Sequence, residues 1–155
     1  MSAARPVDIE VFSESIKRYF DVTTRKKASV RSAYLLDSAE PVVRCDYNGL
    51  INLEGGFRGS VCFSADRGLL THVLLTIGES DYSDESHRDI VGEIANTLSG
   101  RARRHFGEAL DISPPQSFAG RSQAVQPRAS GRPVAIPIDW NGYEAWLVVH
   151  MEPRA

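Results

Sequence analysis

Glu93 and Asn96 are the two residues of this chain whose types and spacing best suit chemistry. On a helix, residues three apart are surface neighbours, so the carboxylate and the amide could engage one partner site together. Phosphoryl chemistry needs positioning and charge neutralisation more than covalent help from the protein. An acid and an amide that project side by side could therefore serve a phosphoryl reaction.

A predicted helix over residues 84–106 carries this pair. At about 100° per residue, Asp89, Glu93, Asn96 and Gly100 fall in one narrow stripe. The opposite side collects the apolar residues Ile90, Val91, Ile94, Ala95, Leu98, Ala102 and Phe106. Gly92 and Gly100 flank the polar pair, and a glycine inside a helix costs about 1 kcal/mol relative to alanine. We therefore expect something to approach the helix closely at these glycines.

Simpler interpretations exist for each of these features. Any amphipathic helix has a solvated polar face. Ser86 and Asp89 also fit a capping box, in which the serine caps the helix and the acid returns to its backbone. The basic residues near the end of the helix suit the negative end of the helix dipole better than a partner-binding patch; they are Arg101, Arg103, Arg104 and His105.

Composition limits the class of protein. The chain has 155 residues, 42% of them hydrophobic, which suits a single domain over residues 1–155. A net charge of −2 gives no overall attraction to nucleic acid or anionic lipid. Because no signal-like start and no apolar run of about 20 residues occurs, we expect a cytoplasmic protein outside the membrane.

The cysteines and histidines do not predict a metal or thiol site. Cys45 and Cys62 lie in strand-like apolar contexts and are expected to be reduced, buried thiols. The histidines are separated from one another without ligand spacing, so structural roles are expected for them; they are His72, His87, His105 and His150.

The remaining pattern predicts an α+β domain with helices packed on one face of an antiparallel sheet. A first helix is expected over residues 7–22, and a second begins after Asp66 and ends near Gly78. Strands are expected over residues 28–36, 42–53, 57–64, 133–140 and 143–151.

Several turns and loops connect these predicted strands. Asn48-Gly49 is interpreted as a break between strands or as a bulge within one long strand. Asn141-Gly142 predicts a tight hairpin turn. Pro133 and Pro137 suit an edge strand. The polar segment 117–132 is expected to be a loop or a frayed edge.

The order of these residues resembles the CheX-type chemotaxis phosphatases, relatives of CheC and of the FliY class of flagellar switch proteins. The family pattern has an acid or serine, then a glutamate, an asparagine and a downstream proline. Here those positions are Asp89, Glu93, Asn96 and Pro114 or Pro115. The segment 54–64 resembles the family's glycine-bearing strand pair, although the interval from the asparagine to the proline is a few residues short. A single copy of the motif favours CheX over CheC.

The resemblance implies a CheC-like fold and hydrolysis of the aspartyl phosphate of a phosphorylated, CheY-like receiver. In that reaction Asn96 would position the attacking water and Glu93 would pair with the receiver's lysine. Asp89 would make a rim contact. The further partner contacts would be Gly92, Gly100, Pro114 and Pro115. The receiver would hold the Mg²⁺ ion, so no cofactor of the chain's own is expected.

The resemblance also implies a homodimer formed through the sheets, with Trp146, Val148 and the final strand offering an edge contact. The alternative function is a non-catalytic module that docks a receiver or a flagellar switch component, or that only dimerises. Its working surface would be the segment 117–132 with the proline-bearing edge. A ligand-sensing domain is a third possibility, for which the sequence offers no pocket signature.

Overall fold

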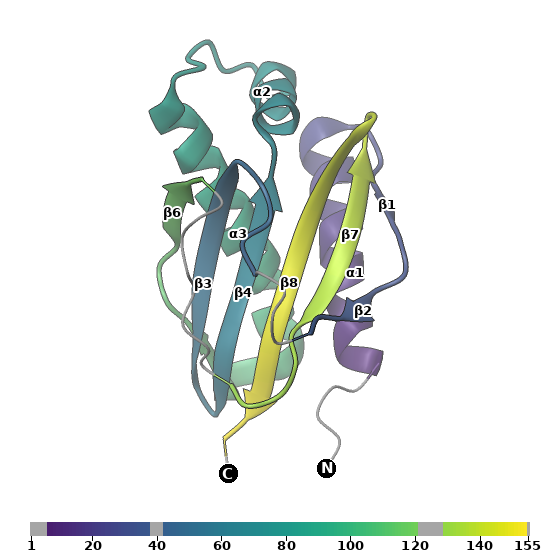
Figure 1. Cartoon of the computed structure of the whole chain (residues 1–155), viewed down its shortest axis with the longest axis vertical. Coiled ribbons are helices and arrows are strands. Elements are labelled where there is room, and N and C mark those ends of the chain that lie inside the picture. The colour runs from purple at the N-terminus through teal and green to yellow at the C-terminus, as the bar shows by residue number, and fades with distance from the viewer. Residues whose placement is uncertain (1–5, 38–41, 121–128, 155) are drawn as a thin grey trace.

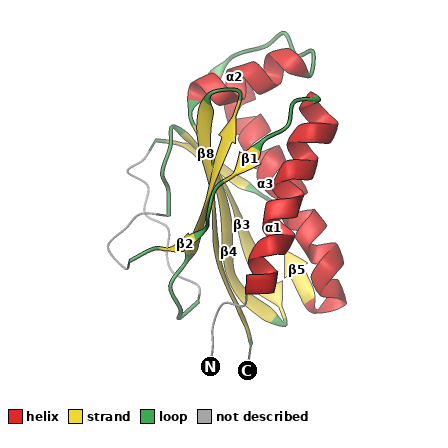
Figure 2. Cartoon of the chain, turned by 90° about the vertical axis from the view of Figure 1, so that its right-hand side faces the viewer, coloured by secondary structure: helices red, strands yellow, loops and turns green. Residues whose placement is uncertain are grey.

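One antiparallel sheet carries helices on a single face (Figure 2). The computed structural model describes residues 6–37, 42–120 and 129–154. Within these ranges the strand order is β1-β7-β8-β4-β3-β5, with β2 paired to β7 and β6 paired to β3. The helical elements are α1 (Pro6–Tyr19), the π-helix η1 (Phe20–Thr24), α2 (Arg67–Thr76), α3 (Asp84–Phe106) and the 3₁₀ helix η2 (Gly107–Ala109). The strands are β1 (Ser29–Val30), β2 (Tyr34–Leu35), β3 (Tyr47–Gly55), β4 (Phe57–Ala65), β5 (Leu110–Ile112), β6 (Gln116–Ala119), β7 (Val134–Trp140) and β8 (Tyr143–Pro153).

Two hairpins form the centre of the sheet, and both turns follow from residue type. The β7–β8 turn places Asn141 at φ 50° and Gly142 at φ 84°, the left-handed backbone that a tight hairpin turn requires. This confirms the predicted turn. The β3–β4 hairpin turns at Gly55, which has φ 79°.

Asn48 and Gly49 do not interrupt a strand. Both lie inside β3, whose register with β4 runs without a gap from Tyr47 opposite Ala65 to Leu53 opposite Gly59. The expected break is therefore wrong, and so is a bulge against β4.

The main core lies between the sheet and the two long helices. Figure 1 shows α3 behind β3 and β4, with α1 behind β7 and β8. The two helices meet where the rings of Phe12 and Phe106 lie 6.4 Å apart. Inward-facing strand residues such as Ile51, Phe63 and Leu147 are fully buried beneath them. Burial of this apolar face holds both helices on the sheet.

The position of β8 corrects the expected dimer contact. β8 lies between β7 and β4, so the final strand is central and offers no free edge. Val148 is only 1% exposed and packs with Leu36 and Ala135, while Trp146 is half-buried against this second cluster. An edge contact through β8 is therefore wrong, and dimerisation itself stays a prediction.

The proline-bearing strand β7 is not an outermost strand either. It pairs with β8 on one side and with the short strands β1 and β2 on the other. Pro137 lies opposite the gap between β1 and β2, where its carbonyl oxygen accepts a hydrogen bond from the backbone N–H of Arg31 at 3.0 Å. A proline, which has no N–H, is tolerated here because no ladder bond is required of it.

The polar segment 117–132 begins at an edge of the sheet, which agrees with the edge alternative. Residues 117–119 belong to β6, which pairs with β3 among the described strands. Residues 121–128 lie outside the described part of the chain. Among the described residues, no helix has the length and apolar character needed to cross a bilayer.

Candidate active site

Helix α3 begins with a serine cap. The Ser83 hydroxyl oxygen accepts a hydrogen bond from the backbone N–H of Ser86 at 3.2 Å. Ser86 is thus inside the helix, and the proposed capping box of Ser86 with Asp89 is wrong. The helix spans Asp84–Phe106, as the sequence predicts. Asp89 therefore lies within the helix, beyond its cap.

The polar stripe of α3 is exposed and unpaired. Asp89, Glu93 and Asn96 are all exposed. Within the described ranges, none of the three makes a hydrogen bond or an ion pair. Asp84 near the start of the same helix differs, because it accepts a hydrogen bond from the Tyr47 hydroxyl at 2.6 Å. The three stripe residues are consequently available to a partner.

The opposite side of α3 is anchored in the core, which fixes where the stripe points. Ile90 is 3% exposed and Ile94 is fully buried. Gly49 of β3 lies directly beneath the helix: a Cβ there would stand 2.5 Å from the Val91 carbonyl oxygen and 3.0 Å from the Ala95 Cβ. The sheet therefore approaches the α3 backbone more closely than any side chain would allow.

Gly92 also marks a close approach, and its neighbour is the chain itself. A Cβ at Gly92 would stand 2.3 Å from the Ser117 hydroxyl oxygen and 3.5 Å from the Pro115 Cβ. Ser117 of β6 pairs in turn with Gly49 of β3. Because Gly92 is buried, the close contact expected there is made by β6 and the segment before it.

The same contact places the prolines beside the stripe. Pro114 and Pro115 are exposed on the connection between β5 and β6, and Pro115 lies next to Gly92, the residue before Glu93. The fold thus joins the downstream prolines to the helix that carries Glu93 and Asn96.

Gly100 has open space around it. No atom lies within 4 Å of a Cβ built there, leaving out the helix's own backbone and chain neighbours. Gly100 is one turn beyond Asn96 and is only half-buried. No part of the described chain therefore occupies the space beside this glycine.

Glu93 borders the end of α1. Burial, and then the nearby Glu93 carboxylate, raise the pKa of the Tyr19 hydroxyl well above its usual value. Tyr19 is 4% exposed and packs edge-on against Phe20, with the two ring centroids 5.2 Å apart. The stripe on α3 is thus flanked by β6 on one side and by α1 on the other.

Comparison with known families identifies the group to which the chain belongs. The sequence model described as Chemotaxis phosphatase CheX matches residues 47–139, more than half of the chain. This protein is a member of the CheX family. The matched range runs from β3 to β7 and includes α3. Comparison with curated protein sequences gave no match.

Solved structures confirm the CheC-like α+β fold. Chemotaxis protein CheX from Vibrio vulnificus is 21% identical, with a TM-score of 0.80 over 94% of this chain and 99% of that one. A CheC-like superfamily protein from Shewanella sp. PV-4 is 21% identical, with a TM-score of 0.82 over 96% and 99%. The match to the CheX-CheY-BeF₃-Mg²⁺ complex from Borrelia burgdorferi is 17% identical, with a TM-score of 0.75 over 96% and 99%.

The buried titratable groups of this CheX-family chain have structural partners. The His87 ring contacts the Thr71 hydroxyl oxygen at 2.6 Å and the Ser83 carbonyl oxygen at 2.7 Å. Both cysteines are buried thiols. Burial raises the pKa of Cys62 to about 12, against a lowering by its hydrogen bond with Ser64. No group of metal-ligating side chains occurs among the described residues.

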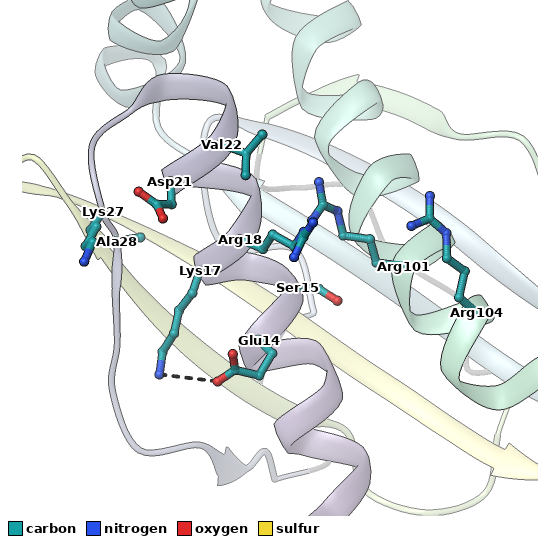
Figure 3. A pocket seen from close by; sticks show the side chains of 10 residues that line it. All are labelled: Glu14, Ser15, Lys17, Arg18, Asp21, Val22, Lys27, Ala28, Arg101 and Arg104. Carbon is teal, nitrogen blue, oxygen red and sulfur yellow. Dashed lines mark ion pairs between the residues drawn. The ribbon is translucent and has the colours of Figure 1, made fainter.

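A basic region lies across the groove between α1 and α3. A depression of about 780 Å³ covers this part of α1, and Arg18, Arg101 and Arg104 are among its lining residues (Figure 3). The predicted basic cluster at the end of α3 did not include Arg18. Only the tertiary packing of α1 against α3 brings that residue to the cluster, so sequence spacing could not have indicated it.

Proposed function

We propose that this CheX-family chain accelerates the hydrolysis of the aspartyl phosphate of a phosphorylated, CheY-like receiver. The observation that carries the proposal is the exposed, unpaired pair Glu93 and Asn96 on one face of α3. The family description and the solved CheX-CheY complex from Borrelia burgdorferi support the choice of substrate.

Asn96 is proposed to orient the attacking water. Its amide oxygen can accept from the water and its NH₂ can donate to it, although an amide is too weak a base to remove a proton beforehand. The water attacks phosphorus, the bond between phosphorus and the aspartyl oxygen breaks, and the products are a free carboxylate and inorganic phosphate. The contribution of Asn96 is therefore one of positioning.

Glu93 is proposed to anchor the receiver through its lysine. A second carboxylate beside a phosphoryl group would be repelled, so Glu93 must reach a cation and leave Asn96 nearest the phosphorus. The spacing of about 5–6 Å between Cβ atoms of residues three apart allows the two contacts together. A Mg²⁺ ion held by the receiver would supply the charge neutralisation that the reaction requires.

The surroundings of the pair provide the rim of the proposed contact. Asp89 lies about two turns before Asn96 on the same stripe. Pro114 and Pro115 lie beside the stripe, because Pro115 is next to Gly92, the residue before Glu93. Gly100 leaves room for a partner backbone on the other side of Asn96.

Phosphate release tests the proposal. Receivers from the same organism are phosphorylated with acetyl phosphate in Mg²⁺, freed of excess donor, and followed with wild type, Asn96→Ala and Glu93→Ala. We expect Asn96→Ala to lose at least about tenfold in kcat, the cost of one misplaced water. Glu93→Ala should mainly raise KM, because it removes an anchor.

Glu10→Ala is the matched control for Glu93→Ala, since Glu10 is an exposed acid on α1. Asn96→Ala is a safe substitution, because the side chain is exposed and alanine is the better helix former. An unchanged phosphate decay with Asn96→Ala would refute the mechanism. Tight binding of the phosphorylated receiver with no change in its decay would instead support the docking module.

A further inference from the structure

Three arginines from two helices converge beside the proposed site. Arg18 extends from α1 and Arg101 from α3, and Figure 3 shows their guanidinium groups pointing toward one another, with Arg104 alongside. We name Arg18, Arg101 and Arg104 the basic cluster. In the described part of the chain, none of these three arginines has an ion-pair or hydrogen-bond partner.

Like charges that gather without a counter-ion oppose folding, so the basic cluster needs a reason. Desolvation by burial, and then the charges of Arg18 and Arg104, lower the pKa of Arg101. The helix dipole accounts for a cation in the last turn of α3, where Arg104 lies. It does not account for Arg101, which precedes that turn, or for the approach of Arg18 from another helix.

The basic cluster lies within reach of any protein that docks on Asn96. At about 1.5 Å rise per residue, Arg101 is about 7.5 Å and Arg104 about 12 Å along α3 from Asn96. A standard interface buries about 800 Å² on each partner, equivalent to a disc with a radius of about 16 Å. Rotation of about 100° per residue places Arg104 about 80° and Arg101 about 140° around the helix from Asn96, on the same side as Glu93. A receiver seated on both Glu93 and Asn96 would therefore reach the cluster at the margin of its interface.

The charges of this surface are separated along the helix. Toward the start of α3 the stripe carries Asp89 and Glu93, and toward its end lie the three arginines of the basic cluster. The depression that these arginines line also holds Glu14, which pairs with Lys17, and Asp21. A partner that covered three unpaired guanidinium groups with neutral surface would bury them at considerable cost. A partner with carboxylates at that place would instead gain charge-assisted hydrogen bonds.

We propose that the basic cluster is a second charged contact of the docking surface, and that it binds a carboxylate-rich patch next to the receiver's phosphorylation site. This inference rests on the proposed function. With Glu93 on a cation and the cluster on an anionic patch, only one rotation of the receiver over α3 satisfies both contacts. The cluster thereby selects among receivers and directs their approach.

Steady-state kinetics and salt dependence test this proposal. The variants are Arg101→Glu, the double variant Arg18→Glu/Arg101→Glu, and the neutral Arg101→Gln. Using the receiver that wild type dephosphorylates fastest, we expect the double variant to raise KM at least tenfold at 50 mM salt. The double variant should bind the receiver more weakly, so its KM rises while its kcat stays the same. Between 50 and 500 mM salt, the wild-type KM should rise toward that of the variant.

Lys27→Glu is the matched control for Arg101→Glu, because it changes the net charge equally. Lys27 is exposed and lies on the other side of α1 from Arg101 (Figure 3). We expect less than a twofold change in KM. Arg101→Gln controls for folding: because it relieves repulsion within the cluster, its Tm should equal or exceed that of wild type.

Failure of this inference can be distinguished from failure of the proposed function. If wild type is active and the double variant keeps its KM and salt dependence, the cluster inference is overturned and the function stands. If no receiver is dephosphorylated, the function fails, and the cluster is judged by binding of receivers loaded with Mg²⁺ and beryllofluoride. Binding that the double variant loses supports the cluster; binding that it keeps, or no binding by wild type, overturns it.

Discussion

Replacing Gly100 with alanine should make the protein more stable and less active. The residue lies inside α3, and no atom is within 4 Å of the Cβ that alanine would add, beyond the local helix backbone. Nothing in the described fold therefore opposes the methyl group. Glycine at this position makes the helix less stable than alanine would, and no contact in the described fold requires a glycine there.

The size of the gain follows from helix propensity. Alanine is favoured over glycine by about 1 kcal/mol in a helix interior. For a chain of 155 residues, this corresponds to a rise in Tm of about 2–4 °C. Thermal unfolding and urea titration of wild type and Gly100→Ala measure it directly. A lower Tm would show that the surface at Gly100 is not open.

The activity of the same variant tests the docking surface. Gly100 lies one turn beyond Asn96 on the stripe that the receiver would cover. An added methyl in a close-packed contact costs about 1–3 kcal/mol, so kcat/KM for the phosphorylated receiver should fall about fivefold or more. A variant that gains stability and keeps its full kcat/KM would show that no partner approaches the helix at this position.

Two further predictions concern the support of α3. Gly49→Ala should lower the free energy of unfolding by about 1–3 kcal/mol in urea titrations. The added Cβ would stand 2.5 Å from the Val91 carbonyl oxygen, and this oxygen belongs to a helix backbone that cannot rotate away. An unchanged unfolding midpoint would contradict the prediction. The hydrogen bond from Tyr47 lowers the pKa of Asp84, so its contribution to stability is present above the unfolded pKa of about 3.9 and is lost as pH falls through the lower folded value. Between pH 5 and 2.5, stability should fall less steeply in Asp84→Asn than in wild type, and parallel pH profiles would exclude the contribution.

Elements with strong local signals could be predicted from the sequence. The bounds of α3 follow from its apolar periodicity, and the β7–β8 turn follows from Asn141 and Gly142, whose backbone preferences are local. The N-cap of α3 could not be chosen from the sequence, because Ser83 and Ser86 are both residues that cap helices well. The hydrogen bond from the Ser86 N–H to the Ser83 hydroxyl oxygen identifies Ser83 as the cap. A choice between two nearby serines requires coordinates.

Features that depend on long-range packing could not be predicted. The last strand of the chain looks like an edge in the sequence, yet β8 pairs on both sides. Asn48-Gly49 looks like a turn in the sequence, but Gly49 is required because α3 crosses β3 at this point. The residues of α3 that cross it, Val91 and Ala95, lie far from Gly49 in the sequence. Arg18 joins Arg101 only because α1 packs on α3. In each case the deciding neighbour is distant in the chain.

The proposed site is an exposed helix face and not a pocket, and the proposed reaction gives a reason for this form. The residues that line the depression over α1 do not include Glu93 or Asn96, and both of these side chains are exposed on α3, so the proposed chemistry lies outside that depression. A projecting helix can enter a site that belongs to another protein, where the phosphoryl group and Mg²⁺ are already held. Under the proposed mechanism the chain would supply only an oriented amide and an anchor, and burial of Ile90 and Ile94 holds the helix that carries both. Catalysis by such a surface would be complete only in the complex, so the proposed contacts that orient the receiver would matter as much as Asn96 itself.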